Sequence, residues 1–301
     1  MLLVKKVLRR TFTGVQYASV GLAPAYRLTS RVRPAHRIPV LVYHKISATD
    51  AAASKLTCTV PQARFDAQMS WLCRARFEPI SIEQYVECLT AGRPFPDRSV
   101  LITFDDGYES VFSRAYPMLR RYGYPAVVFV VTGSLGAKFF PRDEQFAGLP
   151  EELERELTPM TWEQLREAGD LIAAEAHTVT HPRLGRISPE NVDWEVRECA
   201  RQIGECLGRR VVAFAYPDGI RHHGDYNDAT REALVRAGYR VAFNSEVGRN
   251  RIDDDPYSQR RIEPKWTDSR ALFEAKLVGA YDWVGFCQSA FHRVFAPDPG
   301  H

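Results

Sequence analysis

The amino-acid sequence predicts a single-domain α/β fold in which a parallel β-sheet is surrounded by helices. Short apolar runs alternate with helical patterns between residues 38 and 243, which is the arrangement of successive strand–helix units. Polar residues follow several of the apolar runs, and functional residues of parallel α/β folds collect at the carboxyl ends of strands. The chain has 301 residues, 45% of them hydrophobic and 26% charged, so it can bury a sizeable core.

Several helices of this pattern carry signals for where they begin and end. Thr161 with Gln164 is a capping box, and Ser188 before Pro189 places an N-cap ahead of a proline in the first turn. Gly238 ends the last helix of the series. The expected strands are 38–43, 100–104, 126–131, 171–176, 211–215 and 239–243, and the expected helices are 62–75, 109–121, 161–168, 189–207 and 228–237.

The amino-terminal arm, residues 1–37, differs in charge from the rest of the chain. The first 49 residues contain nine Lys or Arg and no acidic residue, and since the whole chain carries +3, residues 50–301 carry about −6. Val4, Leu8, Phe12 and Val15 recur at helical spacing, so the arm is predicted to contact an anionic membrane surface, the alternative being a solvated helix. It is not a clear signal peptide, and it is too short to span a bilayer.

These features predict the organisation and location of the protein. The main domain is expected over residues 38–267, and residues 268–301 are expected to form a helical extension, with one long amphipathic helix over 268–295. A cytoplasmic or inner-membrane-surface location follows from the missing signal peptide. Nucleic-acid binding is not expected, because the main domain is acidic and the arm has no recognisable nucleic-acid-binding fold.

The cysteines are predicted to be buried, reduced thiols. No two of them form a Cys-x-x-Cys pair, so neither a disulfide framework nor a zinc cage is indicated. They are Cys58, Cys73, Cys88, Cys199, Cys206 and Cys287.

Two motifs predict a site for a cation. Asp105 and Asp106 end an apolar run and precede Gly107, which places two carboxylates at the rim of a sheet, although an Asp-rich turn would have the same sequence. His177 and His181 are four residues apart, and on a helical turn both would face one metal ion, the alternative being an incidental pair. Together they indicate a site of two imidazoles and one carboxylate, with open positions for water and substrate.

The ordered set of motifs resembles the NodB homology domain of polysaccharide deacetylases, carbohydrate esterase family 4. The resemblance covers roughly residues 38–265 and implies a distorted (β/α)7-type barrel. It rests on residues 103–107, 177–181 and 214–219 as the first three motifs of the family, and on residues 40–44, 65–68 and 260–262.

The resemblance also implies roles for individual residues. Asp105 matches the catalytic base, and Asp106, His177 and His181 match the metal ligands. Tyr216 matches the residue whose backbone N–H helps to hold the oxyanion. Zinc suits this set of ligands, and cobalt or nickel would fit similar ones.

The general acid and the partner of the base depart from the commonest family pattern. The carboxyl-terminal Leu-x-His motif that supplies the acid in many members is missing, but His44 resembles the acid of circularly permuted members, which include poly-N-acetylglucosamine deacetylases. A capping or core histidine is the alternative for His44. The usual Arg of the third motif is also missing, so Arg261 is a candidate partner for Asp105 or simply a surface residue. Glu175 is either a partner of a ligand histidine or an outward-facing strand residue.

The sequence therefore predicts a metal-dependent hydrolase that removes N-acetyl groups from amino sugars of a polysaccharide or glycolipid precursor. One alternative is hydrolysis of a non-sugar amide or a cyclic ureide, as in allantoinase-like relatives. Phosphoryl transfer through an aspartyl nucleophile is disfavoured, because that chemistry needs carboxylates two residues apart. A third alternative, from another class, is a glycan-binding module without activity.

Overall fold

The computed structural model describes residue 21, residues 37–140 and residues 150–285. The predicted arm, apart from residues 21 and 37, and the last residues of the predicted extension lie outside these ranges. No helix in the described ranges is long and apolar enough to cross a membrane.

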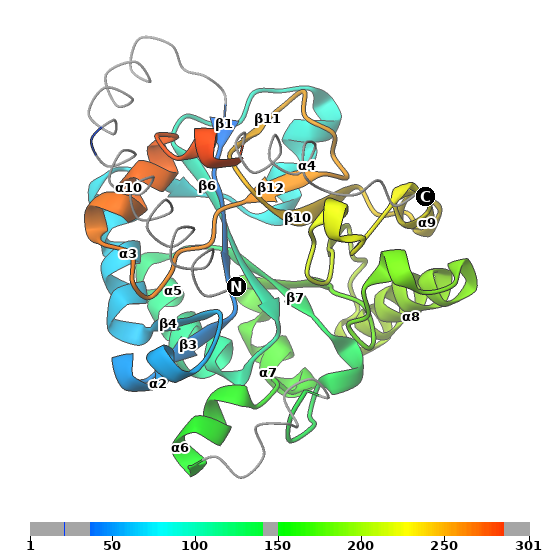
Figure 1. The fold of residues 1–301 in the computed structure, drawn as a ribbon, viewed down its shortest axis with the longest axis horizontal. Helices are drawn as coiled ribbons and strands as arrows, with labels where there is room; N and C mark the ends of the chain where they lie inside the picture. Colours follow the sequence, from blue (N-terminus) through cyan, green and yellow to red (C-terminus); the bar gives the residue numbers. More distant parts are fainter. Residues whose placement is uncertain (1–20, 22–36, 141–149, 286–301) are drawn as a thin grey trace, which may run out of the picture.

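The centre of the molecule is a barrel of parallel strands (Figure 1). Hydrogen-bonded neighbours follow the order β12–β10–β9–β8–β7–β6–β2. The two ends of this row meet, because Val42 N–H donates to Ile262 O at 3.0 Å and Ile262 N–H donates to Val40 O at 2.8 Å. The strands are β2 (Val40–Tyr43), β6 (Ser99–Asp106), β7 (Ala126–Val130), β8 (Ile172–Ala176), β9 (Ala213–Ala215), β10 (Val241–Val247) and β12 (Gln259–Arg261). The predicted distorted (β/α)7-type barrel is confirmed.

Helices surround this barrel, with α3 and α5 on one side and α8 and α9 on the opposite side (Figure 1). The five expected helical segments are all present, although the second begins as a short π-helix. They are α3 (Gln62–Arg74), η1 (Val111–Ala115) continuing into α5 (Tyr116–Tyr122), α7 (Trp162–Glu167), α8 (Pro189–Leu207) and α9 (Asp228–Ala237). The predicted capping box of Thr161 and Gln164 and the N-cap of Ser188 are both formed.

The remaining elements are short, and of these only the last helix, which lies in the segment 268–295, was expected from the sequence. The additional helices are α2 (Asp50–Lys55), α4 (Ile82–Ala91), α6 (Glu151–Glu154) and α10 (Arg270–Val278), with 3-10 turns η2 (Thr132–Ser134), η4 (Arg155–Leu157), η5 (Ala168–Asp170), η6 (Leu184–Arg186) and η7 (Arg221–His223). The additional strands are β1 (Arg37–Ile38) paired with β11 (Asn250–Arg251), β3 (Lys45–Ser47) paired with β4 (Thr59–Pro61), and β5 (Glu78–Pro79) beside β6.

The strands are buried on both faces, as parallel strands covered by helices must be. Side chains of alternate residues point to opposite faces of a strand, so β6 contributes Leu101 to the core inside the barrel and Ile102 to the core under the helices. Tyr85 of α4 belongs to the inner core, and α4 follows β5, which pairs with the first residues of β6. Helix α4 therefore closes the amino end of the barrel, and the carboxyl ends of the strands are left for the site.

Two predictions about the fold are wrong in detail. The single long helix expected over 268–295 ends at Val278, because Gly279 adopts a left-handed conformation (φ +95°) that terminates α10. The cysteines are not all buried: Cys199 is buried, but Cys58 and Cys73 are exposed. The described cysteines are all free thiols, as predicted.

Candidate functional site

One carboxylate and two imidazoles meet at the carboxyl ends of β6 and β8. Asp106 Oδ1 lies 3.5 Å from Nε2 of His177 and 3.5 Å from Nε2 of His181. One ligand atom from each residue lies within 4.8 Å of the other two. Asp106 and His177 are buried, while the His181 side chain is 14% exposed. This donor set fits a divalent transition metal such as zinc, and the exposed side of His181 leaves access from solvent.

The conformation that brings the two imidazoles together is a loop after β8, not the predicted helical turn. Thr178 and His181 both have positive φ angles, +69° and +60°, which are costly for residues other than glycine and need support from their surroundings. Glu195 of α8 gives that support, because its carboxylate accepts the N–H groups of Val179 at 2.7 Å and of Thr180 at 3.0 Å. The loop is thereby held against α8.

The orientation of His177 is set by its second ring nitrogen. Nδ1 lies 2.7 Å from the carbonyl oxygen of Ala215 at the end of β9. Because a carbonyl oxygen can only accept, Nδ1 carries the proton, and the lone pair of Nε2 faces Asp106. The carbonyl group at the end of β9 thus fixes the tautomer and the ring orientation that His177 needs to act as a metal ligand.

Asp105, next to Asp106 on β6, has a different partner. Its Oδ1 accepts a hydrogen bond from Arg261 Nη1 at 2.6 Å, and Arg261 Nε donates to Asn244 O at 2.8 Å. Both side chains are almost fully buried. Burial alone would raise the pKa of Asp105, but the charge of the Arg261 guanidinium outweighs it and the pKa is lowered. Asp105 is therefore a carboxylate at neutral pH, and Arg261 is not a surface residue.

His44 lies between β2 and β3, beside both carboxylates. Its Nδ1 is buried and makes no hydrogen bond within the described part of the chain. Burial lowers the pKa of His44, while the charges of Asp106 and Asp105 act in the opposite direction. The structure thus brings the candidate acid close to the candidate base and ligand, and its catalytic role remains a prediction.

The expectation for Tyr216 is wrong in one respect. Its backbone N–H donates to Phe243 O at 3.0 Å, so this group belongs to the β9–β10 ladder and is not available to an oxyanion. The phenol is also engaged, since it donates to Tyr257 O at 3.0 Å. Pro217 has no N–H, and the next donor along the chain, Asp218 N–H, makes no backbone hydrogen bond with any described residue.

Two buried glutamates support the site from outside it. Glu175 of β8 accepts the N–H groups of Val212 and Ala213, each at 2.8 Å, and pairs with Arg209 at 2.9 Å. It is neither a partner of a ligand histidine nor outward-facing, and it fixes β9 beside β8. Glu195 was missed in the sequence, although a signal exists: it lies between Val192 and Val196 on the apolar face of α8, where an acidic residue needs a partner.

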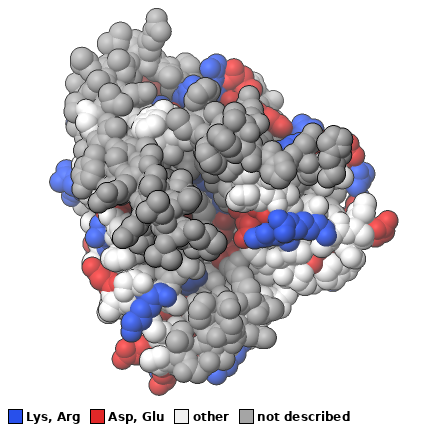
Figure 2. All heavy atoms as spheres, viewed as in Figure 1, with Lys and Arg blue, Asp and Glu red and all other residues white. Residues whose placement is uncertain are grey.

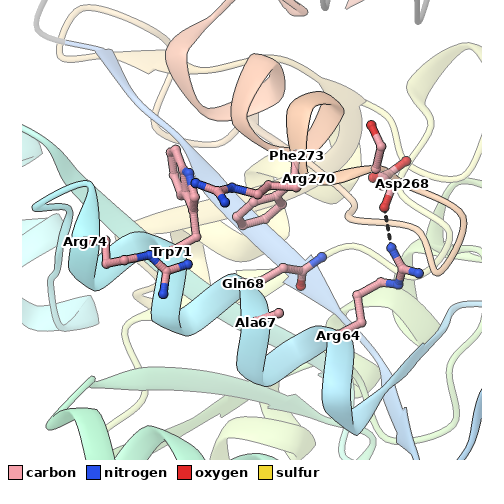
Figure 3. A pocket seen from close by; sticks show the side chains of 9 residues that line it. Arg64, Ala67, Gln68, Trp71, Arg74, Asp268, Arg270 and Phe273 are labelled. Carbon is pink, nitrogen blue, oxygen red and sulfur yellow. Dashed lines mark hydrogen bonds between the residues drawn. The ribbon is translucent and has the colours of Figure 1, made fainter.

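A pocket away from these residues lies between α3 and α10 (Figure 3). It has a volume of about 240 Å³, and Arg64 at its edge donates to Asp268 O at 2.5 Å. None of the candidate catalytic or metal-binding residues lines it, so it is not the candidate active site. On the face of the molecule seen in Figure 2, acidic atoms lie in a hollow near the middle, and basic side chains lie along one side of it.

Comparison with known proteins agrees with this geometry. A profile of the family described as "Polysaccharide deacetylase" matches residues 92–242. A Bacillus subtilis protein named putative polysaccharide deacetylase YxkH is 27% identical over 226 residues, which are 75% of this chain and 71% of that protein. The poly-beta-1,6-N-acetyl-D-glucosamine N-deacetylase of Escherichia coli is 31% identical over 244 residues, which cover 71% of this chain but only 35% of that enzyme.

The fold is also found among solved structures. The Streptococcus pyogenes deacetylase PplD, in complex with acetate, matches with a TM-score of 0.67 at 23% identity, over 80% of this chain and 98% of that one. At this identity the likeness shows the fold.

The matches to named deacetylases assign the chain to the hydrolases rather than to binding modules. The chain belongs to the polysaccharide deacetylase family, because the family profile spans half of it. The resemblance stated from the motifs is thereby confirmed, and so is the enzyme class, hydrolysis of a carbon–nitrogen bond outside peptides. Nothing in the comparisons favours a cyclic ureide, a non-sugar amide or a module without activity.

Proposed function

We propose that this protein removes N-acetyl groups from amino sugars of a polysaccharide and that it needs a divalent metal, most simply Zn²⁺, to do so. The observation that carries the proposal is the division between two adjacent carboxylates. Asp105 is paired with Arg261, whereas Asp106 faces two imidazoles. The name of the Escherichia coli relative supports an N-acetylglucosamine polymer as the substrate class.

Asp106, His177 and His181 would hold the metal. Once bound, the ion would act as a Lewis acid toward the acetyl carbonyl. Two imidazoles and a carboxylate suit zinc, and cobalt or nickel would be accepted by the same ligands.

Asp105 would act as the general base. The Arg261 guanidinium occupies Oδ1, so Oδ2 is the oxygen that can accept a proton from the attacking water. The low pKa of Asp105 keeps the carboxylate ionised, and the buried pair with Arg261 fixes its direction.

His44 would act as the general acid on the leaving amine. The water oxygen bonds to the acetyl carbon, the C–N bond breaks, and the nitrogen takes the proton of His44. Acetate and a free amino sugar are the products. With Tyr216 N–H engaged in the ladder, the N–H of Asp218 is the donor that we assign to the developing oxyanion.

Acetate release from N-acetylglucosamine oligomers tests this proposal. The purified protein should release acetate, lose activity with a chelator and regain it with Zn²⁺. Asp105→Asn should retain bound metal and lose at least ~10²-fold in kcat, whereas His177→Ala should lose both metal and activity. Undiminished turnover by Asp105→Asn, or full activity in the metal-free protein, would refute the mechanism.

A further inference from the structure

A second group of metal-ligating side chains lies next to the candidate site. His44, Cys58 and Glu263 each offer one ligand atom, and these atoms lie within 4.8 Å of one another. The three residues come from distant parts of the chain: the turn after β2, the residue before β4, and the segment after β12. His44 and Glu263 are half-buried, and Cys58 is exposed. Solvent therefore reaches the cluster from the side of Cys58.

The side chains of this cluster suit a transition metal in chemistry as well as in position. Imidazole, thiolate and carboxylate are the three kinds of zinc ligand in proteins. Although Cys58 is exposed as a residue, its thiol is surrounded densely enough that desolvation, together with the Glu263 charge, raises its pKa to about 11. Nδ1 of His44 is buried and has no hydrogen-bond partner in the described ranges. A cation at this place would be within reach of one ligand atom from each of the three groups and would give Nδ1 of His44 a partner.

We propose that His44, Cys58 and Glu263 form a second site for a divalent transition metal, and that a metal bound there inhibits deacetylation. The inhibitory part rests on the proposed function, in which His44 donates a proton to the leaving amine. An imidazole whose lone pair is bound to a metal at one nitrogen cannot be in the doubly protonated form that the acid step requires. Binding exchanges the thiol proton of Cys58 for the metal, and the proton leaves to solvent.

The charges around the cluster predict that this site is the weaker of the two. Asp106 acts on both His44 and Cys58, but its charge would be largely neutralised once the first site is filled. Lys45 also acts on both groups, and its positive charge opposes a second cation. We therefore expect the second site to fill only when metal exceeds one equivalent per chain.

Cobalt binding tests the site without reference to activity. The first site contains no thiol, so cobalt bound there cannot give a thiolate-to-cobalt charge-transfer absorption. Such an absorption would report cobalt bound at a cysteine elsewhere in the protein. Full-length protein stripped of metal and titrated with Co²⁺ should develop this absorption after the first equivalent. Cys58→Ser should abolish it, and Cys73→Ser, which changes the other exposed cysteine of the described residues, should retain it. Absence of the absorption in the wild type, or its persistence in Cys58→Ser, would overturn the proposal.

Enzyme assays test whether the site inhibits. Wild-type and Cys73→Ser proteins should lose at least ~10-fold in rate as Zn²⁺ rises from one equivalent to a large excess, and Cys58→Ser should keep its rate. Equal inhibition of Cys58→Ser would refute the inhibitory role. Asp106→Asn removes a ligand of the first site but none of the second, so this variant should still show the cobalt–thiolate absorption. Failure of the proposed function and failure of the second site therefore give different results.

Discussion

At the scale of single residues, the two carboxylates at the end of β6 have different partners, and these partners suit them to different roles. Asp105 must stay ionised inside the protein, and the buried hydrogen bond from Arg261 lowers its pKa. Asp106 instead faces the Nε2 atoms of two imidazoles. Adjacent residues of a strand point in different directions, so one strand end supplies both a base and a ligand.

Replacing Arg261 with methionine should raise the pKa of Asp105, because burial then acts without its main opposing charge. A base must be ionised, so the acidic limb of kcat/KM should move to higher pH. The variant should also lose about 3–5 kcal/mol of stability, because a buried charge is left without its partner. A pH–rate profile and urea unfolding measure the two effects.

The stability effect has a defined pH dependence. A carboxyl whose folded pKa lies below its ordinary value of 3.8 stabilises the fold above that pH, and this contribution is lost as the pH falls further. The difference between wild type and Arg261→Met should therefore shrink in strong acid. Arg260→Met, which changes the exposed neighbour of Arg261, should leave the acidic limb in place. An unmoved limb in Arg261→Met would show that the pair does not tune the base.

His44 should control the alkaline side of the same profile. A general acid must carry its proton, so the rate should fall as the pH rises through the pKa of His44, which burial lowers. We expect His44→Gln to reduce kcat by ~10²–10⁴-fold and to remove this decline. His223→Gln, at an exposed histidine of η7, serves as the control. An alkaline decline that survives in His44→Gln would assign the acid to another group.

At the scale of elements, the ligand loop depends on a helix that lies far from it in sequence. The Glu195 carboxylate of α8 receives two backbone N–H groups and the hydroxyl of Thr180. Without these hydrogen bonds, the unfavourable backbone conformation of Thr178 and His181, which have positive φ angles, would be less stable. The spacing of the two imidazoles is thus a property of the loop and α8 together.

Glu195→Gln should weaken metal binding by about 10–100-fold, since an amide cannot accept all of the bonds that the carboxylate accepts. The loss of stability should be about 1–3 kcal/mol. Glu198→Gln, at a half-buried residue of the same helix that pairs with the exposed Arg201, should change stability by at most ~1 kcal/mol and metal affinity not at all. Calorimetric metal titration of the three proteins decides the matter; unchanged affinity in Glu195→Gln would contradict the role of α8.

The elements that could be predicted from the sequence are those whose pattern is local. The apolar run of β6 and the capped, amphipathic α8 were found at nearly their true bounds because burial and caps leave marks in the sequence. Strand β12 has the sequence Gln-Arg-Arg, and only its pairing with β10 makes it a strand. In the same way, the partner of Tyr216 N–H is a carbonyl on another strand, which no motif reveals.

At the scale of the whole molecule, the seam of the barrel lies beside the site. Strand β12 joins β2 through Ile262, and Arg261 and Glu263 flank that joint. Helix α10 holds the following segment, because the buried Lys276 ammonium donates to Glu263 O at 2.8 Å and to Asp268 Oδ2 at 2.5 Å. Barrel closure, the partner of the base and the second ligand cluster thus depend on one stretch of chain.

Lys276→Met should therefore destabilise the protein by about 3–5 kcal/mol, because the buried Asp268 carboxylate loses its cation. Adding Asp268→Asn should recover part of this loss, since the uncompensated charge is then gone. Arg155→Met, which breaks the exposed pair with Glu151, should cost at most ~1 kcal/mol. Urea unfolding of the wild type, Lys276→Met, Asp268→Asn and the double variant gives the coupling energy of the pair, and Arg155→Met is unfolded beside them as the control. If Lys276→Met lost no more unfolding free energy than Arg155→Met, then α10 would not stabilise the junction of β12 and β2.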